Sequence, residues 1–191
     1  LRTPRDGEAR RDVIMDSRKV LVTGGSKLPK DLCPVVREIG RRLMVDTEFQ
    51  MITGGLREAK PGIPTTDYEA VAGALTGLQQ RGREPSERIL TMLPQSDSVP
   101  SQRFEHGTVI RVQRSDPRAR RYSMVLSSDA IVVIAGEKGT REIIDLAWIA
   151  GKPVIPIAGS GMAARERWNL YRPDLLARLA LTNEEVRTFE A

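Results

Sequence analysis

Short apolar runs that end in glycine alternate with stretches of helical periodicity in the first half of the chain. Residues 20–23 and 50–53 are rich in β-favouring side chains, and two glycines follow each run. Residues 31–44 and 67–82 each predict a helix. The apolar face of the first helix consists of Leu32, Val35, Val36, Ile39 and Leu43. The pattern therefore predicts two consecutive strand–helix units.

The second half repeats this alternation around a longer apolar run. Residues 88–93 predict a third strand, closed by Pro94 because proline cannot continue a central ladder. Residues 130–135 are apolar without interruption, as in a strand buried on both faces. We expect helices over residues 121–128 and 142–150, and a last strand over residues 153–157.

Two stretches carry weaker patterns. Residues 95–120 are polar, and their Val109, Ile110 and Val112 suit either a short strand or part of a helix. The last third, with Leu175 and Leu176 among its spaced leucines, predicts helix with polar breaks.

Strands that alternate with helices are typical of one class of fold. The chain is predicted to be an α/β protein with a Rossmann-like, doubly wound, mainly parallel sheet flanked by helices. A length of 191 residues suits one such domain, which we place at residues 17–191. Residues 1–16 are polar and charged, so they are interpreted as a linker or an N-terminal extension. Ligands of such sheets bind at the carboxyl ends of the strands, where the glycine loops lie.

The composition favours some classes of ligand and partner over others. The net charge is +5, while aromatic residues make up only 4%, which disfavours a stacking surface for single-stranded nucleic acid and fits an anionic small ligand. One cysteine and one histidine predict neither a disulfide nor a metal site, and no cofactor is expected. No apolar stretch is long enough for a membrane span, so a cytoplasmic protein is the expectation.

The loop after the longest apolar run is the strongest candidate for ligand binding. Glycines let the backbone approach an anion, and the N–H groups at the start of the following helix favour phosphate. A basic side chain and a hydroxyl lie in the same turn. An ordinary strand-to-helix turn is the alternative interpretation. The candidate residues are Gly136, Glu137, Lys138, Gly139 and Thr140.

The two earlier glycine loops are further candidates. Gly24, Gly25, Ser26 and Lys27 combine glycine at a strand end with a hydroxyl and a cation, which suits a phosphate or a ribose. Their spacing is neither that of a P-loop nor that of Gly-x-Gly-x-x-Gly. Two adjacent glycines, Gly54 and Gly55, could form a third backbone wall, although such a pair is also common in simple turns.

Residues 120–156 resemble the core of the SLOG superfamily, and above all its LOG members. The LOG pattern has Arg-x-x-x-Met, Ser-Asp-Ala and then Pro-Gly-Gly-x-Gly-Thr-x-x-Glu. This chain has Arg120 and Met124, then Ser128, Asp129 and Ala130, then the stretch AGEKGTREI at residues 135–143. The resemblance extends over residues 19–157 and implies a nucleotide-binding α/β fold.

Two departures from the LOG pattern bear on activity. LOG enzymes are phosphoribohydrolases, and the resemblance implies a catalytic role for the last glutamate of the motif, which is Ile143 here. Glu142 precedes it, and one residue rotates a helical side chain by about 100°. Glu137 replaces the second glycine and would repel a phosphate. If the chain is an enzyme, Glu142 is the catalytic candidate, with Asp129 as a further acid, but the departures favour recognition.

Three hypotheses follow. The first is a sensory SLOG domain of the kind found in Thoeris-type antiphage defence, where the resemblance implies an NAD-derived ligand such as a cyclic ADP-ribose isomer, a fused or associated effector and a homo-oligomer. Several arginines precede the phosphate loop and are candidates to clamp a second phosphate. They are Arg103, Arg111, Arg114, Arg120 and Arg121. The second hypothesis is a LOG-like nucleotide N-glycosidase, and the third, placed last, is a DprA-like nucleic-acid binder.

Overall fold

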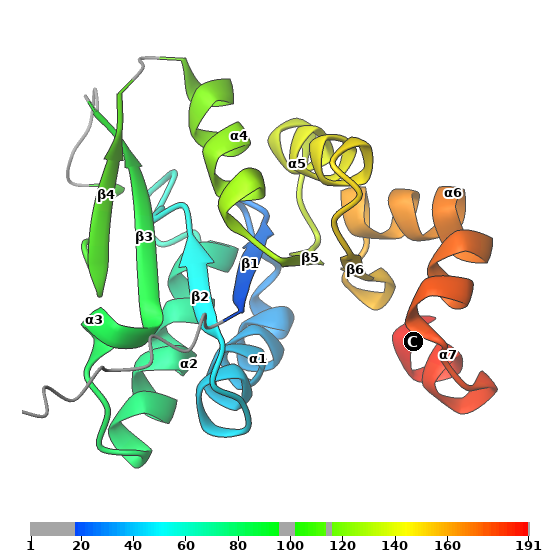
Figure 1. Ribbon diagram of the computed structural model, residues 1–191, viewed down its shortest axis with the longest axis horizontal. Helices are drawn as coiled ribbons and strands as arrows, with labels where there is room; N and C mark the ends of the chain where they lie inside the picture. Colours follow the sequence, from blue (N-terminus) through cyan, green and yellow to red (C-terminus); the bar gives the residue numbers. More distant parts are fainter. Residues whose placement is uncertain (1–17, 96–101, 114–115, 191) are drawn as a thin grey trace, which may run out of the picture.

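The computed structural model describes residues 18–95, 102–113 and 116–190 (Figure 1). Six parallel strands form one sheet in the order β4-β3-β2-β1-β5-β6. The strands are β1 (Lys19–Gly24), β2 (Gln50–Thr53), β3 (Ile89–Pro94), β4 (Thr108–Val112), β5 (Ala130–Ile134) and β6 (Val154–Ile157). The sheet confirms the predicted Rossmann-like α/β fold, and it resolves the open question over residues 108–112 in favour of a strand.

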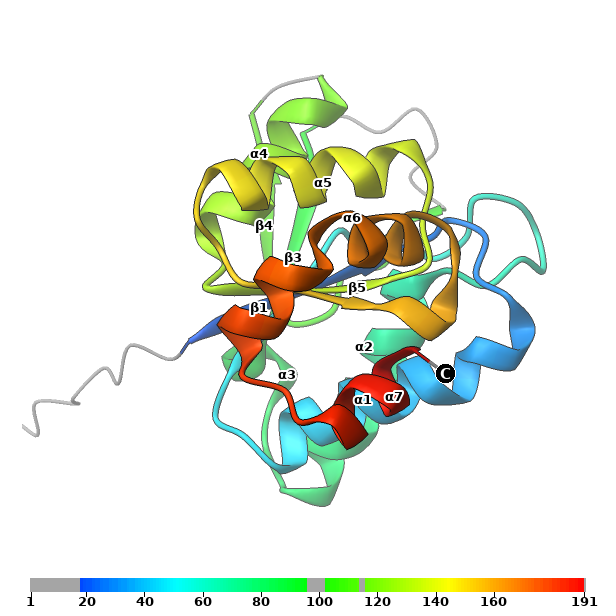
Figure 2. The ribbon, with the colours of Figure 1, turned by 90° about the vertical axis from the view of Figure 1, so that its right-hand side faces the viewer.

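Helices cover both faces of this sheet. Figure 2 shows α1 and α2 on one side, and α4, α5 and α6 on the other. The helices are α1 (Cys33–Val45), α2 (Thr66–Gln80), α3 (Pro85–Arg88), α4 (Pro117–Ser127), α5 (Lys138–Ile149), α6 (Met162–Leu179) and α7 (Asn183–Glu190), with short 3₁₀ turns η1 (Lys30–Leu32) and η3 (Ala158–Ser160). None of these helices is both long and apolar enough to cross a membrane.

Side chains that alternate along the strands pack into two separate hydrophobic cores, one on each face of the sheet. Val20 and Val22 of β1 pack with α1 and α2, whereas Leu21 between them packs with the helices of the other face. This division follows from the period of two in a strand. A third, smaller cluster around Trp168 joins α6 to α7. Trp168 is therefore a core residue, whereas Trp148 is half-buried and stacks on Tyr171 with ring centroids 4.1 Å apart.

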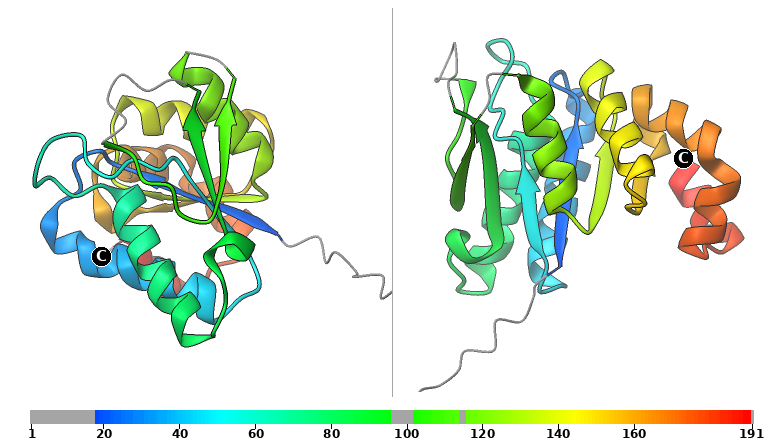
Figure 3. Two further views of the ribbon diagram at one scale, coloured as in Figure 1. Left: turned by 90° about the vertical axis from the view of Figure 1, so that its left-hand side faces the viewer. Right: turned by 45° about the horizontal axis from the view of Figure 1, so that its top comes forward.

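The order in which strands are added to the sheet reverses between β1 and β5. The strands run outward from β1 to β4, and α4 then carries the chain back over the other face to β5, which pairs with β1 (Figure 3). The carboxyl ends of β1 and β5 therefore diverge into helices on opposite faces. In a doubly wound sheet such a switch point opens a crevice for ligand.

Three helix starts differ from the expectation. Helix α4 begins at Pro117 rather than at residue 121, because Asp116 caps it: the Arg118 N–H donates to Asp116 Oδ1 at 2.8 Å. Helix α5 begins at Lys138 rather than at residue 142. Helix α1 follows a 3₁₀ turn, and Val35, assigned to its apolar face, is exposed. Proline at the first helical position and an aspartate before it mark the α4 start in the sequence.

The predicted linker, residues 1–16, lies outside the described residues. Cys33 lies at the start of α1 and is half-buried, packed against the core.

Candidate functional site

A cleft lies at the carboxyl ends of β1, β2 and β5. Its volume is about 230 Å³. The loops after these three strands, the start of α5 and one side of α4 surround it. The lining residues are Thr23, Gly24, Gly25, Ser26, Gly54, Leu56, Asp67, Arg120, Arg121, Met124, Glu137, Lys138, Gly139, Thr140 and Ile143. The cleft is therefore at the switch point, where the glycine loops were expected to meet.

The loop between β5 and α5 has an unusual backbone. Ala135 and Gly136 both have positive φ, at 52° and 94°, a region that an alanine rarely adopts. The Ala135 N–H donates to Ser160 Oγ at 2.7 Å, which holds this conformation. The turn directs the chain from β5 into α5 at the rim of the cleft. Positions under such strain are common at ligand sites.

The N-terminus of α5 faces the cleft without a cap. The residue before the helix is Glu137, and no side chain accepts a hydrogen bond from the first turn. The N–H groups of Lys138 and Gly139 have no intrahelical acceptor because of their place in the helix. Together with the helix dipole, these N–H groups make the start of α5 electropositive.

The hydroxyl of Thr140 connects two of the glycine loops. It is buried and donates to the Gly24 carbonyl oxygen at 3.0 Å. Gly24 in turn packs so closely on β5 that a Cβ there would lie 2.0 Å from the Ile134 oxygen. Thr140 therefore holds the β1 and β5 loops together, and its proton is already donated to protein.

Two consecutive arginines of α4 reach opposite sides of the cleft. The Arg121 guanidinium lies over the start of α5, where a Cβ on Gly139 would be 2.9 Å from its Nη2. Arg121 also pairs with Glu142 at 2.5 Å. Arg120 turns the other way, and its Nη1 donates to the Gly54 carbonyl oxygen at 2.6 Å. Arg121 thus lies beside the N-terminus of α5, although the sequence pattern favoured Arg120.

An acid, Asp67, lines the wall near β2. It belongs to the first turn of α2, and its Oδ2 accepts from the Leu56 N–H at 3.1 Å. Burial raises the pKa of Asp67, while the Leu56 N–H, Arg120 and Arg103 act in the opposite direction. Sequence reasoning missed this residue, because an aspartate at a helix start is also an ordinary way to complement the helix dipole.

Most of the candidate residues come together in the cleft, but some do not line it. Lys27 is exposed, whereas Gly55 and Gly136 are buried, and none of the three lines the cleft. Arg111 pairs with Glu105 away from the cleft, and Arg114 lies outside the described residues. Arg103 Nη1 is 3.5 Å from the Gly54 carbonyl oxygen, so it lies near the β2 loop.

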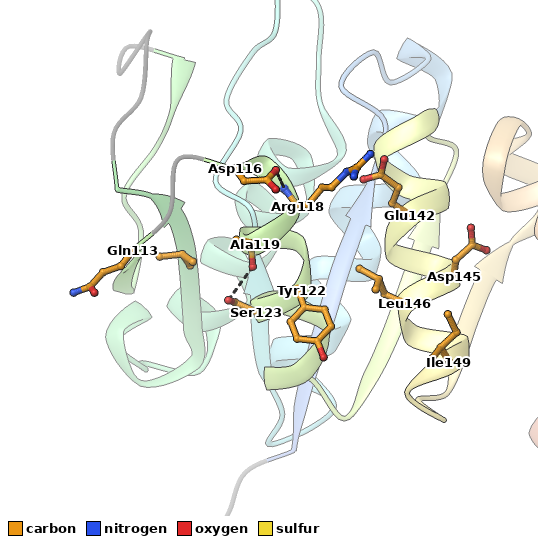
Figure 4. Close-up of a pocket in the computed structure, with 11 residues that line it drawn as sticks. Gln113, Asp116, Arg118, Ala119, Tyr122, Ser123, Glu142, Asp145, Leu146 and Ile149 are labelled. Carbon is orange, nitrogen blue, oxygen red and sulfur yellow. Dashed lines mark hydrogen bonds between the residues drawn. The ribbon is translucent and has the colours of Figure 1, made fainter.

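Glu142 lines a different hollow, on the outer side of α4 and α5. Figure 4 shows this groove, which has a volume of about 790 Å³, with Tyr122 on α4 opposite Leu146 and Ile149 on α5. Tyr122 is 52% exposed and Ile149 82% exposed. Ile143, the next residue, lines the cleft instead. The one-residue shift predicted from the motif therefore places the carboxylate outside the cleft.

Within the described residues, no group of three or more histidine, cysteine, aspartate or glutamate side chains is arranged to hold a metal ion. The side chains that line the cleft include three cations, Arg120, Arg121 and Lys138, and two acids, Asp67 and Glu137.

The fold and the cleft define a Rossmann-like α/β protein with a crevice at its switch point. A family model described as the SLOG cluster4 family matches residues 17–172. The chain therefore belongs to this family, as the resemblance to the SLOG superfamily implied. A search of curated proteins found no match.

Solved structures share the fold. TM1055, a structural genomics target, is 22% identical with a TM-score of 0.61, over 80% of this chain and 81% of that one. The molybdenum cofactor binding protein of Rippkaea orientalis is 20% identical with a TM-score of 0.57, over 73% and 76%. DNA processing protein A of Helicobacter pylori, described as binding single-stranded DNA, is 14% identical with a TM-score of 0.53, over 73% and 65%. At these identities the likeness establishes the fold.

Proposed function

We propose that this chain binds a small nucleotide-type ligand in the cleft, with a phosphate at the N-terminus of α5. The observation that carries the proposal is the uncapped first turn of α5, which opens into the cleft beside Lys138 and Arg121. Free N–H groups, a helix dipole and two cations at one point favour a phosphate over a neutral group.

The more specific form of the proposal is a sensory domain. Its ligand is an NAD-derived nucleotide, a cyclic ADP-ribose isomer or a related ADP-ribose compound, and binding regulates a fused or associated effector in antiphage defence. Membership of a SLOG family and the position of Glu142 outside the cleft support this form. Ligand pockets usually have volumes of roughly 300–1,000 Å³. A cleft of about 230 Å³ would enclose one phosphate-bearing part of such a ligand and leave the rest at the rim.

The homo-oligomer that a sensory role implies has a candidate contact surface on α4 and α5. Tyr122, Leu126 and Ile149 expose apolar side chains on α4 and α5. Apolar and aromatic residues concentrate at the centre of protein interfaces. Arg121 lines the cleft and Glu142 lines the groove, so their ion pair connects the two sites.

A thermal-shift panel tests the proposal. The protein is melted with AMP, ADP-ribose, NAD and cyclic ADP-ribose isomers, because a ligand of the native state raises the melting temperature with its occupancy. We expect at least one compound to stabilise the native chain, and a Lys138→Ala variant to lose most of that shift. Lys30→Ala, an exposed lysine away from the cleft, is the matched control. No shift with any of the compounds would reject the proposal.

A second assay separates recognition from hydrolysis. The chain is incubated with AMP, NAD and nucleosides, and release of the base is measured. We expect none above the blank. Base release that Glu142→Ala abolishes would overturn the sensor and support the N-glycosidase. A salt-dependent shift of single-stranded DNA would instead support a DprA-like role.

A further inference from the structure

The wall of the cleft opposite the α5 N-terminus carries a negative side chain. Asp67 lines the cleft from the first turn of α2. Lys138, Gly139 and Arg121 line it from the side of α5 and α4, where two cations and the N–H groups of the helix start outweigh one exposed acid, Glu137. A carboxylate repels a phosphate and accepts hydrogen bonds from neutral donors. The two sides of the cleft therefore suit different parts of a ligand.

The position of Asp67 is held by its neighbours. Its Oδ2 accepts from the Leu56 N–H at 3.1 Å, and Gly54 leaves room for it, since a Cβ there would lie 2.9 Å from the same oxygen. The adjacent Arg120 donates to the Gly54 carbonyl oxygen, so its guanidinium is anchored on the same wall. The carboxylate is thus fixed at the cleft by backbone contacts from the β2 loop.

Burial of Asp67 disfavours the ionised form of its carboxyl group. Desolvation is the largest influence on Asp67, and it outweighs the Leu56 N–H and the two nearby arginines, so that the pKa is raised. A buried carboxylate that is not fully compensated gains from a further hydrogen-bond donor. A hydroxyl of the ligand would supply that donor.

We propose that Asp67 accepts a hydrogen bond from a hydroxyl group of the ligand, so that the cleft selects a phosphate ester of a sugar or other polyol over a bare phosphate. This inference rests on the proposed function and adds a specificity-determining residue to it. The volume of about 230 Å³ is consistent with a sugar phosphate as the enclosed part.

Calorimetry with three small probes tests the inference. Inorganic phosphate, methyl phosphate and ribose 5-phosphate share the anion, but only the last offers several hydroxyl donors. We expect the native chain to bind ribose 5-phosphate about tenfold more tightly than methyl phosphate, as for one hydrogen bond to a charged group. In Asp67→Asn, which keeps an acceptor for the Leu56 N–H, this ratio should fall towards one.

Two controls make the outcomes separable. Asp31→Asn, an exposed aspartate away from the cleft, should keep the native ratio, and a melting curve checks that each variant folds. An unchanged ratio in Asp67→Asn, or no preference in the native chain, would overturn the inference while phosphate binding stands. If the native chain binds none of the three probes, the proposed phosphate site itself is wrong.

Discussion

The guanidinium of Arg121 fills the space that a side chain on Gly139 would occupy. A Cβ at residue 139 would lie 2.9 Å from Arg121 Nη2 and 3.2 Å from its Cζ. Glycine at this position therefore lets α4 place a cation over the first turn of α5. The same guanidinium also forms an ion pair with Glu142.

Gly139→Ala should displace Arg121 and weaken binding of phosphate-bearing ligands by about tenfold, since one charge-assisted contact would be lost. The fold should remain, because alanine is favoured over glycine in a helix by about 1 kcal/mol. Calorimetry and urea unfolding measure the two effects. In an Arg121→Ala background the same substitution should change affinity little, and an equal loss there would contradict the stated contact.

Lys138→Ala and Arg120→Ala should each weaken nucleotide binding, by roughly three- to tenfold, with the melting temperature of the free protein nearly unchanged for Lys138→Ala. Lys138 is exposed at the cleft rim, and Arg120 is anchored on Gly54 across from it. Isothermal titration provides both values, with Lys30→Ala as the control. Native affinity in both cleft variants would tell against the site.

Glu137→Gln should raise the affinity for inorganic phosphate by roughly two- to fivefold. Glu137 is an exposed acid directly before the α5 N-terminus, and it lines the cleft. Removing its charge removes repulsion at a helix end, where charges contribute about 0.3–1 kcal/mol at low ionic strength. Titrations at low and high salt check this, because the gain should shrink with added salt. If Glu137→Gln bound phosphate more weakly than the native chain, Glu137 would instead accept a hydrogen bond from the ligand.

Asp67→Asn should stabilise the free protein increasingly as the pH rises above 3.8. The pKa of Asp67 is raised from 3.8, mainly by burial, so its ionisation is harder in the folded chain than in the unfolded one. Below pH 3.8 the acid is protonated in both states; as the pH rises through the folded pKa, stability is lost. Urea unfolding of both proteins at several pH values measures the difference. A difference that is independent of pH would contradict the shift.

Gly73→Ala should destabilise the chain by roughly 1–3 kcal/mol although helix propensity favours alanine. A Cβ at residue 73 would lie 1.8 Å from the Arg37 carbonyl oxygen, so α1 and α2 would have to separate. Thr76→Ala, on the exposed side of α2, should stay within about 0.5 kcal/mol of the native chain. Urea unfolding compares the two variants. Equal stabilities would mean that the helices adjust without loss.

Much of the fold follows from local patterns. Continuous apolar runs such as residues 130–134 predict buried strands, and the spacing between them predicts the helices. Helix starts were less accurate: Asp116 and Pro117 form a cap and first turn that apolar periodicity does not register. The assignment of residues 108–112 stayed open, because none of them is buried and their pairing with β3 is not visible in the local pattern.

The sequence by itself determined the class of fold, the SLOG superfamily and the glycine loops, because each depends on residues close together in the chain. The tertiary structure decided which charges meet there. Arg121 and Asp67 reach the cleft from α4 and α2, and Glu142 leaves it, because helix rotation and packing set where a side chain points. Residues 137–140 thus form one wall of a cleft whose other wall depends on the packing of α2 and the β2 loop.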